Sequence, residues 1–406
     1  MSKINDDFFV EKKEWSKTKD KILGRYLVPY FQKVFALRKP VCYVDCFAGK
    51  GKFDDGNDGS PIIALKSLDS TFVRSKHNPI VSTYFIELNH GDSLENNVEN
   101  YKHKPYQVDV IKGRFEDNID SILDKHDSDT IFLYIDPYGI KALDVNKFNS
   151  FKKYESKSVE LLINFNTWGF VREACRIYGA TIDLDEDVFD FLKEYDPSKI
   201  TDAIELTNIV GGKFWISIIK DYKNGKINFN EAEELITKKI AENFRKKYKY
   251  VLNLPVISSE DATIPKYRLF HLTNHAEGCY LMANNMHDAF VTAEENNRHG
   301  QMSLFEDASD RKIYSDEELK KMLFNELPDR VNITPFICEF YTKYGMLANT
   351  SKLEKLIAEL EKEGLVKLNR LPSSSNGKKL SFMKESKDHK LIIEKLRKVV
   401  RAEWKQ

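Results

Sequence analysis

Several features that would place a chain outside the cytoplasm are scarce or absent here. The 406 residues include only 5 cysteines, too few for a disulfide framework. The N-terminal stretch MSKINDDFFVEKKEW is too polar for a signal peptide, and no apolar run approaches the ~20 residues of a membrane span. We therefore expect a soluble, cytoplasmic protein with no membrane partner.

An excess of charge of one sign is also absent. The chain has 63 basic and 63 acidic residues, so no global field steers it toward nucleic acid. Any basic surface must be local. The candidates are 244–250 (FRKKYKY), 395–405 (KLRKVVRAEWK), and Lys19 and Lys21 near the N-terminus, each of which is either a solvated helix face or a phosphate-contacting surface.

Metal-binding patterns are missing as well. Cys42 and Cys46 share one apolar segment, with no nearby third cysteine or histidine to complete a site. Buried free cysteine behaves as a small hydrophobe, so these residues are interpreted as reduced structural thiols. No metal site is predicted.

What the chain does contain is an alternation of short apolar runs with amphipathic segments. This rhythm is typical of an α/β protein with a parallel sheet and helices on both faces. Strands are expected at 41–47, 80–88, 106–113, 130–139 and 158–166. Helices are expected at 15–36, 60–68 (with Ser60 as N-cap), 92–101 and 115–126.

The pattern changes along the chain and predicts five segments. They are a Rossmann-like cofactor-binding core (1–175), a helical insertion (176–248), closing strands at 249–258 and 265–274 with a helix that complete the core (249–296), a linker (297–316) and a C-terminal domain (317–406). The last segment shows helices at 332–344 and 351–364, a two-stranded ribbon and a basic helix over 387–404. That order resembles a winged helix.

A glycine-containing turn follows the first expected strand: Asp45-Cys46-Phe47-Ala48-Gly49-Lys50-Gly51. In open parallel sheets, ligands bind outside the carboxyl ends of the strands. Glycine lets the backbone approach a ligand closely, although GxG alone is also consistent with a purely structural turn. We expect Asp45, Phe47, Ala48, Gly49 and Gly51 to contact a cofactor.

The other expected strands also end in acidic residues. Glu87 is placed to accept the hydroxyls of a ribose, and Phe115 and Glu116 are placed to flank an adenine. Asp136 ends the fourth strand. Each acid alone is also typical of a helix cap or a turn. Together they would repel a pyrophosphate, so the cationic cofactor S-adenosyl-methionine fits better.

Four motifs together resemble the three-Cys-motif partner (TcmP) family. They are WSKTKDKILGRYL (15–27), YVDCFAGKGKFDDGNDGSPIIAL (43–65), FLYIDPYG (132–139) and YRLFHLTNHAEGCYLM (267–282). These methyltransferase-like proteins are named for a neighbouring radical protein that carries three cysteines. The resemblance implies a class I methyltransferase sheet of seven strands with a final antiparallel strand, and that radical protein as a partner. The insert at 52–61 is expected to form a lip over the methionine end of the cofactor.

The loop after the fourth strand indicates the acceptor. Asp136-Pro137-Tyr138-Gly139 resembles the [DNS]PP[YFW] pattern of enzymes that methylate base amines, with one proline missing. We expect Asp136 to orient and deprotonate an amine, the Pro137 carbonyl to help hold that amine, and Tyr138 to stack on a base. Asp136 is also expected to contact the methionine portion of the cofactor.

A second group of residues is expected to face the same acceptor. Asn164 and Asn166 would hold it, and Trp168 would offer a stacking surface. Both asparagines also suit ordinary turns at a strand end.

The sequence therefore predicts an S-adenosyl-methionine-dependent methyltransferase acting on an amine of RNA or DNA. One alternative is a methyltransferase-fold binding or accessory protein that works with a partner, in a mobile-element or antiviral phage-defence system. A second alternative is an enzyme that uses the cofactor for another reaction or acceptor.

Overall fold

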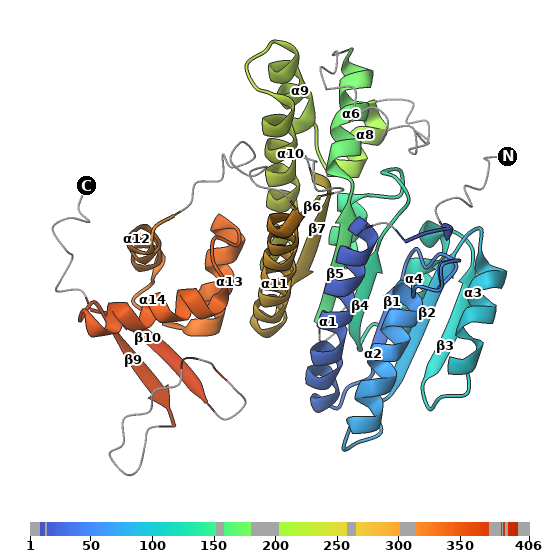
Figure 1. Cartoon of the computed structure of the whole chain (residues 1–406), viewed down its shortest axis with the longest axis horizontal. Helices are drawn as coiled ribbons and strands as arrows, with labels where there is room; N and C mark the ends of the chain where they lie inside the picture. Colours follow the sequence, from blue (N-terminus) through green and yellow to red (C-terminus); the bar gives the residue numbers. More distant parts are fainter. Residues whose placement is uncertain are drawn as a thin grey trace. The chain divides into compact units, whose positions relative to one another are not determined.

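The computed structural model contains two compact units, Met1–Asn274 and His275–Gln406. Figure 1 shows their helices and strands coloured along the sequence. The structure describes residues 9–12, 14–151, 158–179, 203–257, 265–300, 314–372, 383, 385 and 389–396. Among these residues, no helix is long and apolar enough to cross a membrane.

The first unit is built on a seven-stranded sheet with the order β3-β2-β1-β4-β5-β7-β6 (Figure 1). Strands β1 to β5 pair in parallel, and β7 runs antiparallel to both β5 and β6. The predicted mixed α/β fold, with a seven-stranded, mostly parallel sheet closed by an antiparallel strand, is confirmed. The strands are β1 (Val41–Asp45), β2 (Val81–Glu87), β3 (Gln107–Lys112), β4 (Thr130–Ile135), β5 (Ser158–Phe165), β6 (Tyr250–Ile257) and β7 (Pro265–Thr273).

The central strands are buried along their whole length because helices cover both faces of the sheet. On one face, α1 (Glu14–Ala36) packs against α2 (Ser60–Arg74). The rings of Tyr26 and Tyr30 in α1 lie 5.8 and 5.1 Å from the ring of Phe132 in β4. Further along the sheet, α3 (Gly91–Val98) and η2 (Glu99–Tyr101) follow β2.

The opposite face carries one large apolar core. It joins the sheet to residues of the predicted helical insertion, whose described part is helical from Ala203 to Phe244. Residues 180–202 lie outside the described residues. The helices that contribute to this core are α4 (Phe115–Lys125), α5 (Val145–Ser150), α6 (Thr167–Tyr178), α8 (Ala203–Val210), α9 (Phe214–Lys223) and α10 (Phe229–Phe244).

The second unit has its own core. Leu319, Leu323, Ile337, Leu356 and Ile393 are each at most 1% exposed. Its three-stranded antiparallel sheet has the order β8-β10-β9. Its elements are α11 (Ala276–Gly300), α12 (Asp316–Glu326), β8 (Arg330–Asn332), α13 (Ile333–Tyr344), α14 (Thr350–Lys362), β9 (Val366–Leu371) and β10 (Lys390–Lys395). Helix α11, which we grouped with the first core, packs here against α13 and α14.

Two local predictions are wrong. Residues 390–395 form strand β10 and not part of a helix over 387–404, because Leu391 and Ile393 alternate into the core as a strand requires. Residues 397–406 lie outside the described part of the chain. The N-cap of α2 is Gly59 and not Ser60. The Ser60 hydroxyl instead lies near Asp45 and lowers the pKa of that carboxyl.

Candidate functional site

Three predicted polar residues meet at the carboxyl edge of the sheet. Asp45 ends β1, Asp136 follows β4, and Asn164 lies near the end of β5. The register pairs Asp45 with Tyr134 and Ile135 with Ile163 across neighbouring strands. Because side chains alternate along a strand, these three residues project from the face that α1 covers.

Asp45 is the most deeply buried acid of the site, at 0% exposure. Its Oδ1 accepts a hydrogen bond from the Phe47 backbone N–H at 3.3 Å, whereas its Oδ2 has no hydrogen-bond partner. Burial raises the pKa of Asp45 to about 7, against the lowering effect of the Ser60 hydroxyl and the Phe47 amide. A buried oxygen without a donor is costly, so this edge is suited to a ligand that brings an N–H group or a positive charge.

Asp136 has a different environment because it is fully paired. Lys19 Nζ donates to both carboxylate oxygens, at 2.9 and 2.7 Å. The Tyr134 hydroxyl donates at 3.2 Å, and Asn164 Nδ2 donates at 2.6 Å. Lys19 is 5% exposed, whereas Lys21, two residues further along α1, is exposed. From the sequence, both lysines suit either a solvated helix face or a phosphate-contacting surface, and no local signal indicates the contact of Lys19 with Asp136.

The glycine turn is held by Glu87. Gly49 and Gly51 have φ values of 61° and 81°, which favour glycine. The Gly49 N–H donates to Glu87 Oε2 at 2.8 Å, while Glu87 Oε1 accepts from the backbone N–H groups of Asn89 and His90 at 2.8 and 3.1 Å. A carboxylate has about four lone-pair sites, and three backbone N–H groups already donate to Glu87. A ribose would therefore share the Glu87 carboxylate with the glycine turn.

The start of the described chain covers this turn. The Phe9 carbonyl accepts a hydrogen bond from Asp54 N–H at 2.8 Å. A Cβ atom at position 49 would lie 3.1 Å from the Phe9 ring. The insert at 52–61 is therefore attached to the N-terminal segment, and its predicted place over the methionine end of a cofactor stays a prediction.

Lys12 and Asp20 extend this contact toward α1. Lys12 Nζ lies 2.5 Å from Asp20 Oδ2 and donates to the Asp58 carbonyl at 2.5 Å. Burial raises the pKa of Asp20 to about 6 in spite of the ion pair with Lys12. The α1 side of the edge thus combines the acids Asp20, Asp45 and Asp136 with two lysine ammonium groups.

The predicted adenine-binding residues are not all accessible. Phe115 is 3% exposed, and its ring lies 5.3 Å from the Phe47 ring and 6.5 Å from the Phe148 ring. The structure therefore places Phe115 in the core, where a ring beside α4 is needed for packing. Ala48 is also buried, at 4% exposure, whereas Glu116 is exposed in the first turn of α4.

The predicted acceptor residues also separate. Tyr138 is 55% exposed, next to buried Pro137. Asn166 caps α6 by accepting the Gly169 N–H at 2.7 Å, which is the turn role that the sequence left open. Trp168 is 5% exposed and packs 5.8 Å from the Phe229 ring, so the structure buries the expected stacking surface. Asn164 is the member of this set that contacts Asp136.

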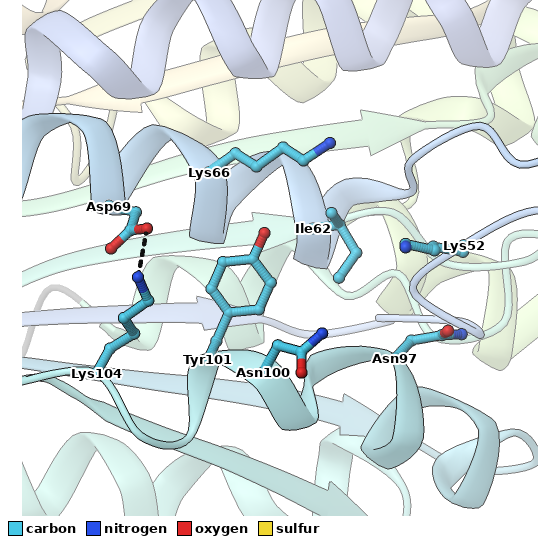
Figure 2. A pocket seen from close by; sticks show the side chains of 8 residues that line it. All are labelled: Lys52, Ile62, Lys66, Asp69, Asn97, Asn100, Tyr101 and Lys104. Atoms are coloured by element: carbon cyan, nitrogen blue, oxygen red, sulfur yellow. Dashed lines mark hydrogen bonds and ion pairs between the residues drawn. The ribbon is translucent and has the colours of Figure 1, made fainter.

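A separate groove of about 290 Å³ lies between α2 and the α3–η2 segment (Figure 2). Lys66 and Lys104 in its lining form ion pairs with Asp58 at 2.5 Å and Asp69 at 3.0 Å. None of the predicted site residues lines this groove. The lining residues are Lys52, Ile62, Lys66, Asp69, Asn97, Asn100, Tyr101 and Lys104.

Comparisons with known proteins leave the family of the chain open. No protein-family model matches the chain, and no curated protein matches its sequence. Among solved structures, a loganic acid methyltransferase with SAH aligns with 95% of this chain and 97% of that chain, at 7% sequence identity and a TM-score of 0.22. A likeness at that TM-score carries no argument about function. The assignment to a Rossmann-like fold consistent with methyltransferases therefore rests on the strand order of the sheet.

Proposed function

We propose that this chain is an S-adenosyl-methionine-dependent methyltransferase. The observation that carries the proposal is the buried Asp45 carboxyl, which has one unpartnered oxygen beside a glycine turn at the carboxyl edge of a parallel sheet. Such an edge is where open α/β sheets bind ligands. A sulfonium compound with a free amino group supplies the positive charge and the N–H donors that this carboxyl lacks.

The residues present fit that cofactor in part. Asp45 would accept from its amino group, and the backbone at Gly49 and Gly51 would allow close approach. Glu87 would receive the ribose while keeping its hydrogen bonds to the turn. Glu116, which is exposed next to buried Phe115, would contact the adenine. When bound, the cofactor would supply a methyl group activated by the sulfonium sulfur.

We further propose an amine as the methyl acceptor. Asp136 would hold the amine through its N–H groups and take up the proton that is released. Asn164 and Tyr134 fix the Asp136 carboxylate by hydrogen bonds, which supports an orienting role. Tyr138, which is 55% exposed beside Asp136, would contact a planar group attached to that amine.

Nucleic acid is the acceptor class that we favour. Lys52, Lys66 and Lys104 line the groove of Figure 2 and form a local basic surface on a chain with no net charge. Lys66 and Lys104 are paired with the half-buried aspartates Asp58 and Asp69, and such surface pairs are weak enough for a phosphate to compete. Phosphates would bind at this groove and not at the acidic edge.

The second unit supports a nucleic-acid role less directly. We infer a winged helix from the element order α12-β8-α13-α14-β9-β10. Helix α14 is partly covered by α11. Glu354 accepts a hydrogen bond from the Tyr280 hydroxyl of α11, and the Thr350 hydroxyl donates one to Asn284 Oδ1 of α11. Helix α14 would therefore meet a partner through its exposed residues, among them Lys355 and Lys362. Membership of the TcmP family, with its radical partner, stays a prediction from the motifs.

An accessory role is the second candidate, and one observation favours it. Both Glu87 oxygens already accept backbone N–H groups, so the structure could be complete without a ribose. Titration calorimetry with S-adenosyl-methionine separates the candidates. Binding that is lost in Asp45→Ala and kept in the exposed control Asp127→Asn supports the enzyme. Absence of binding at millimolar cofactor overturns it.

Methyl transfer is then tested with labelled cofactor on total RNA and total DNA. Asp136→Asn keeps the shape of the side chain and removes its charge, so turnover should fall about 10²-fold or more, the usual contribution of a general base. Cofactor affinity should change much less. Equal transfer by the parent and Asp136→Asn would contradict the assignment of Asp136.

A further inference from the structure

The ion pair between Lys19 and Asp136 joins two elements that lie far apart in the sequence. Lys19 belongs to the second turn of α1, and Asp136 follows β4. Both carboxylate oxygens accept from the same Nζ atom, at 2.9 and 2.7 Å. The Lys19 side chain is 7% exposed and the Asp136 side chain 22%, so the Asp136 side of the contact is the more open to solvent.

The surroundings of the Lys19 ammonium form a complete cation site. Nζ also lies 5.2 Å from the centroid of the Tyr267 ring, within the range of a cation–π contact. Asn164 donates to Asp136 through Nδ2, and its own Oδ1 is buried with no hydrogen-bond partner. The site thus offers a carboxylate, an aromatic face and a spare amide oxygen, which suits an ammonium group with three N–H donors.

We propose that Asp136, Asn164 and Tyr267 form a binding site for a primary amine, and that Lys19 fills this site with its own side chain when no amine is bound. The amine binds in its ammonium form, because the negative charge of Asp136 and the face of the Tyr267 ring favour a cation. It gives one proton to Asp136, which frees its lone pair, before it can accept a methyl group. Lys19 then acts as an internal competitor that an incoming amine must displace. Binding of the amine is independent of the proposed function. Its use as a methyl acceptor rests on the proposed function.

The test replaces the Lys19 side chain by a free amine. Lys19→Ala keeps Cβ, removes the other three side-chain carbons with the ammonium group, and leaves the site open. Calorimetry with n-butylammonium chloride should give a Kd at least tenfold lower for Lys19→Ala than for the parent protein. Lys21→Ala, which removes an exposed lysine two residues along the same helix, should bind the amine as the parent does.

A second substitution establishes where the amine binds. Adding Asp136→Asn to Lys19→Ala should abolish the gain in affinity, and tetramethylammonium, which has no N–H donor, should bind at least tenfold more weakly than n-butylammonium. Equal n-butylammonium affinity in Lys19→Ala and Lys21→Ala would overturn the proposal. So would a gain in affinity that survives Asp136→Asn.

The stability of the variant provides another measurement of the same property. If Lys19→Ala is too unstable to purify, refolding with n-butylammonium in the buffer should restore it and refolding with tetramethylammonium should not. Recovery with both salts, or with neither, would contradict the proposal.

Methylation of n-butylamine by Lys19→Ala, assayed separately with labelled cofactor, tests the proposed function. Amine binding without methyl transfer would support the amine site and contradict the use of this amine as a methyl acceptor.

Discussion

At the scale of single residues, the site depends on two aspartates with opposite partners. Asp136 is bound by an ammonium, a hydroxyl and an amide, so its charge is compensated. Asp45, two positions offset on the neighbouring strand, has one oxygen without a donor, and its pKa is raised to about 7 by burial. The protein therefore keeps one acid paired and leaves the other to be satisfied by a ligand or a proton.

We expect Asp45→Asn to stabilise the free protein at alkaline pH. Burial raises the pKa of Asp45 from 3.8 to about 7, so between these values the folded state binds more protons than the unfolded state. The contribution of Asp45 to stability therefore falls as pH rises through this window. At pH 8 the variant should gain on the order of 4 kcal/mol, because each of about three pKa units corresponds to about 1.4 kcal/mol.

Urea unfolding of the parent and the variant from pH 5 to 8.5 measures this effect. Asp127→Asn, an exposed aspartate, serves as the control and should follow the parent. The nearby acids Asp20 and Asp136 also raise the pKa of Asp45. If Asp45→Asn kept the parent's full pH dependence of stability, that dependence would come from these two acids and not from Asp45.

The glycine turn gives a second prediction at this scale. Gly49→Val should abolish binding of S-adenosyl-methionine, because the new side chain meets the Phe9 ring and stands in the turn that must approach the cofactor. Gly56→Val is the matched control: its φ is 85°, yet nothing lies within 4 Å of a Cβ there. Both should lose about 1–2 kcal/mol of stability from the left-handed backbone, and calorimetry should show lost binding for Gly49→Val alone. Normal binding by Gly49→Val would make the turn purely structural.

At the scale of elements, a buried ion pair ties the helical insertion to the sheet. Glu233 in α10 is 1% exposed and accepts from Arg268 in β7, at 2.9 and 2.5 Å. Thr167 of α6 and Thr237 also donate to this carboxylate. Every oxygen is satisfied, so the pair fixes where α10 sits on β7 and α6.

Glu233→Ala should therefore destabilise the protein by about 3–5 kcal/mol, since it leaves the Arg268 guanidinium buried without a counter-ion. Glu242→Ala on the same helix is the control. Glu242 and Lys239 form a pair whose side chains are 40% and 46% exposed, and removing it should cost less than about 1 kcal/mol. Similar losses for the two variants in chemical denaturation would show that the buried pair does not hold the insertion.

At the scale of the whole molecule, every predicted cofactor and acceptor residue lies in the first unit, Met1–Asn274. The second unit has its own apolar core and its own antiparallel sheet. Because each unit buries its own apolar surface, each satisfies the main requirement for folding alone.

We expect the fragment 275–406 to unfold in one cooperative transition and the fragment 1–274 to bind S-adenosyl-methionine within about tenfold of the intact chain, a difference of about 1.4 kcal/mol. Thermal unfolding followed by circular dichroism tests the first expectation, and calorimetry tests the second. A fragment 1–274 that is folded but does not bind the cofactor would show that the second unit contributes to the site.

The sequence alone determined the elements whose pattern is local. Runs such as VCYVD and TIFLYI are apolar on both faces, which specifies buried parallel strands without any knowledge of neighbours. The order of strands and helices then specified the fold class, and glycine in the first turn specified a backbone with positive φ. The prediction was wrong for strand β10. Its alternation of apolar and polar residues, from Lys390 to Lys395, is short, and the basic residues around it suit a helix equally well.

Which side chains share an environment depends on tertiary contacts. Lys19 and Lys21 are indistinguishable in sequence, yet the turn of α1 buries the first against Asp136 and leaves the second in solvent. The sequence predicts Phe115 and Trp168 as stacking surfaces, but both rings are covered by packing against other aromatic rings. Burial and pairing are properties of contacts between distant segments, and no local pattern carries them.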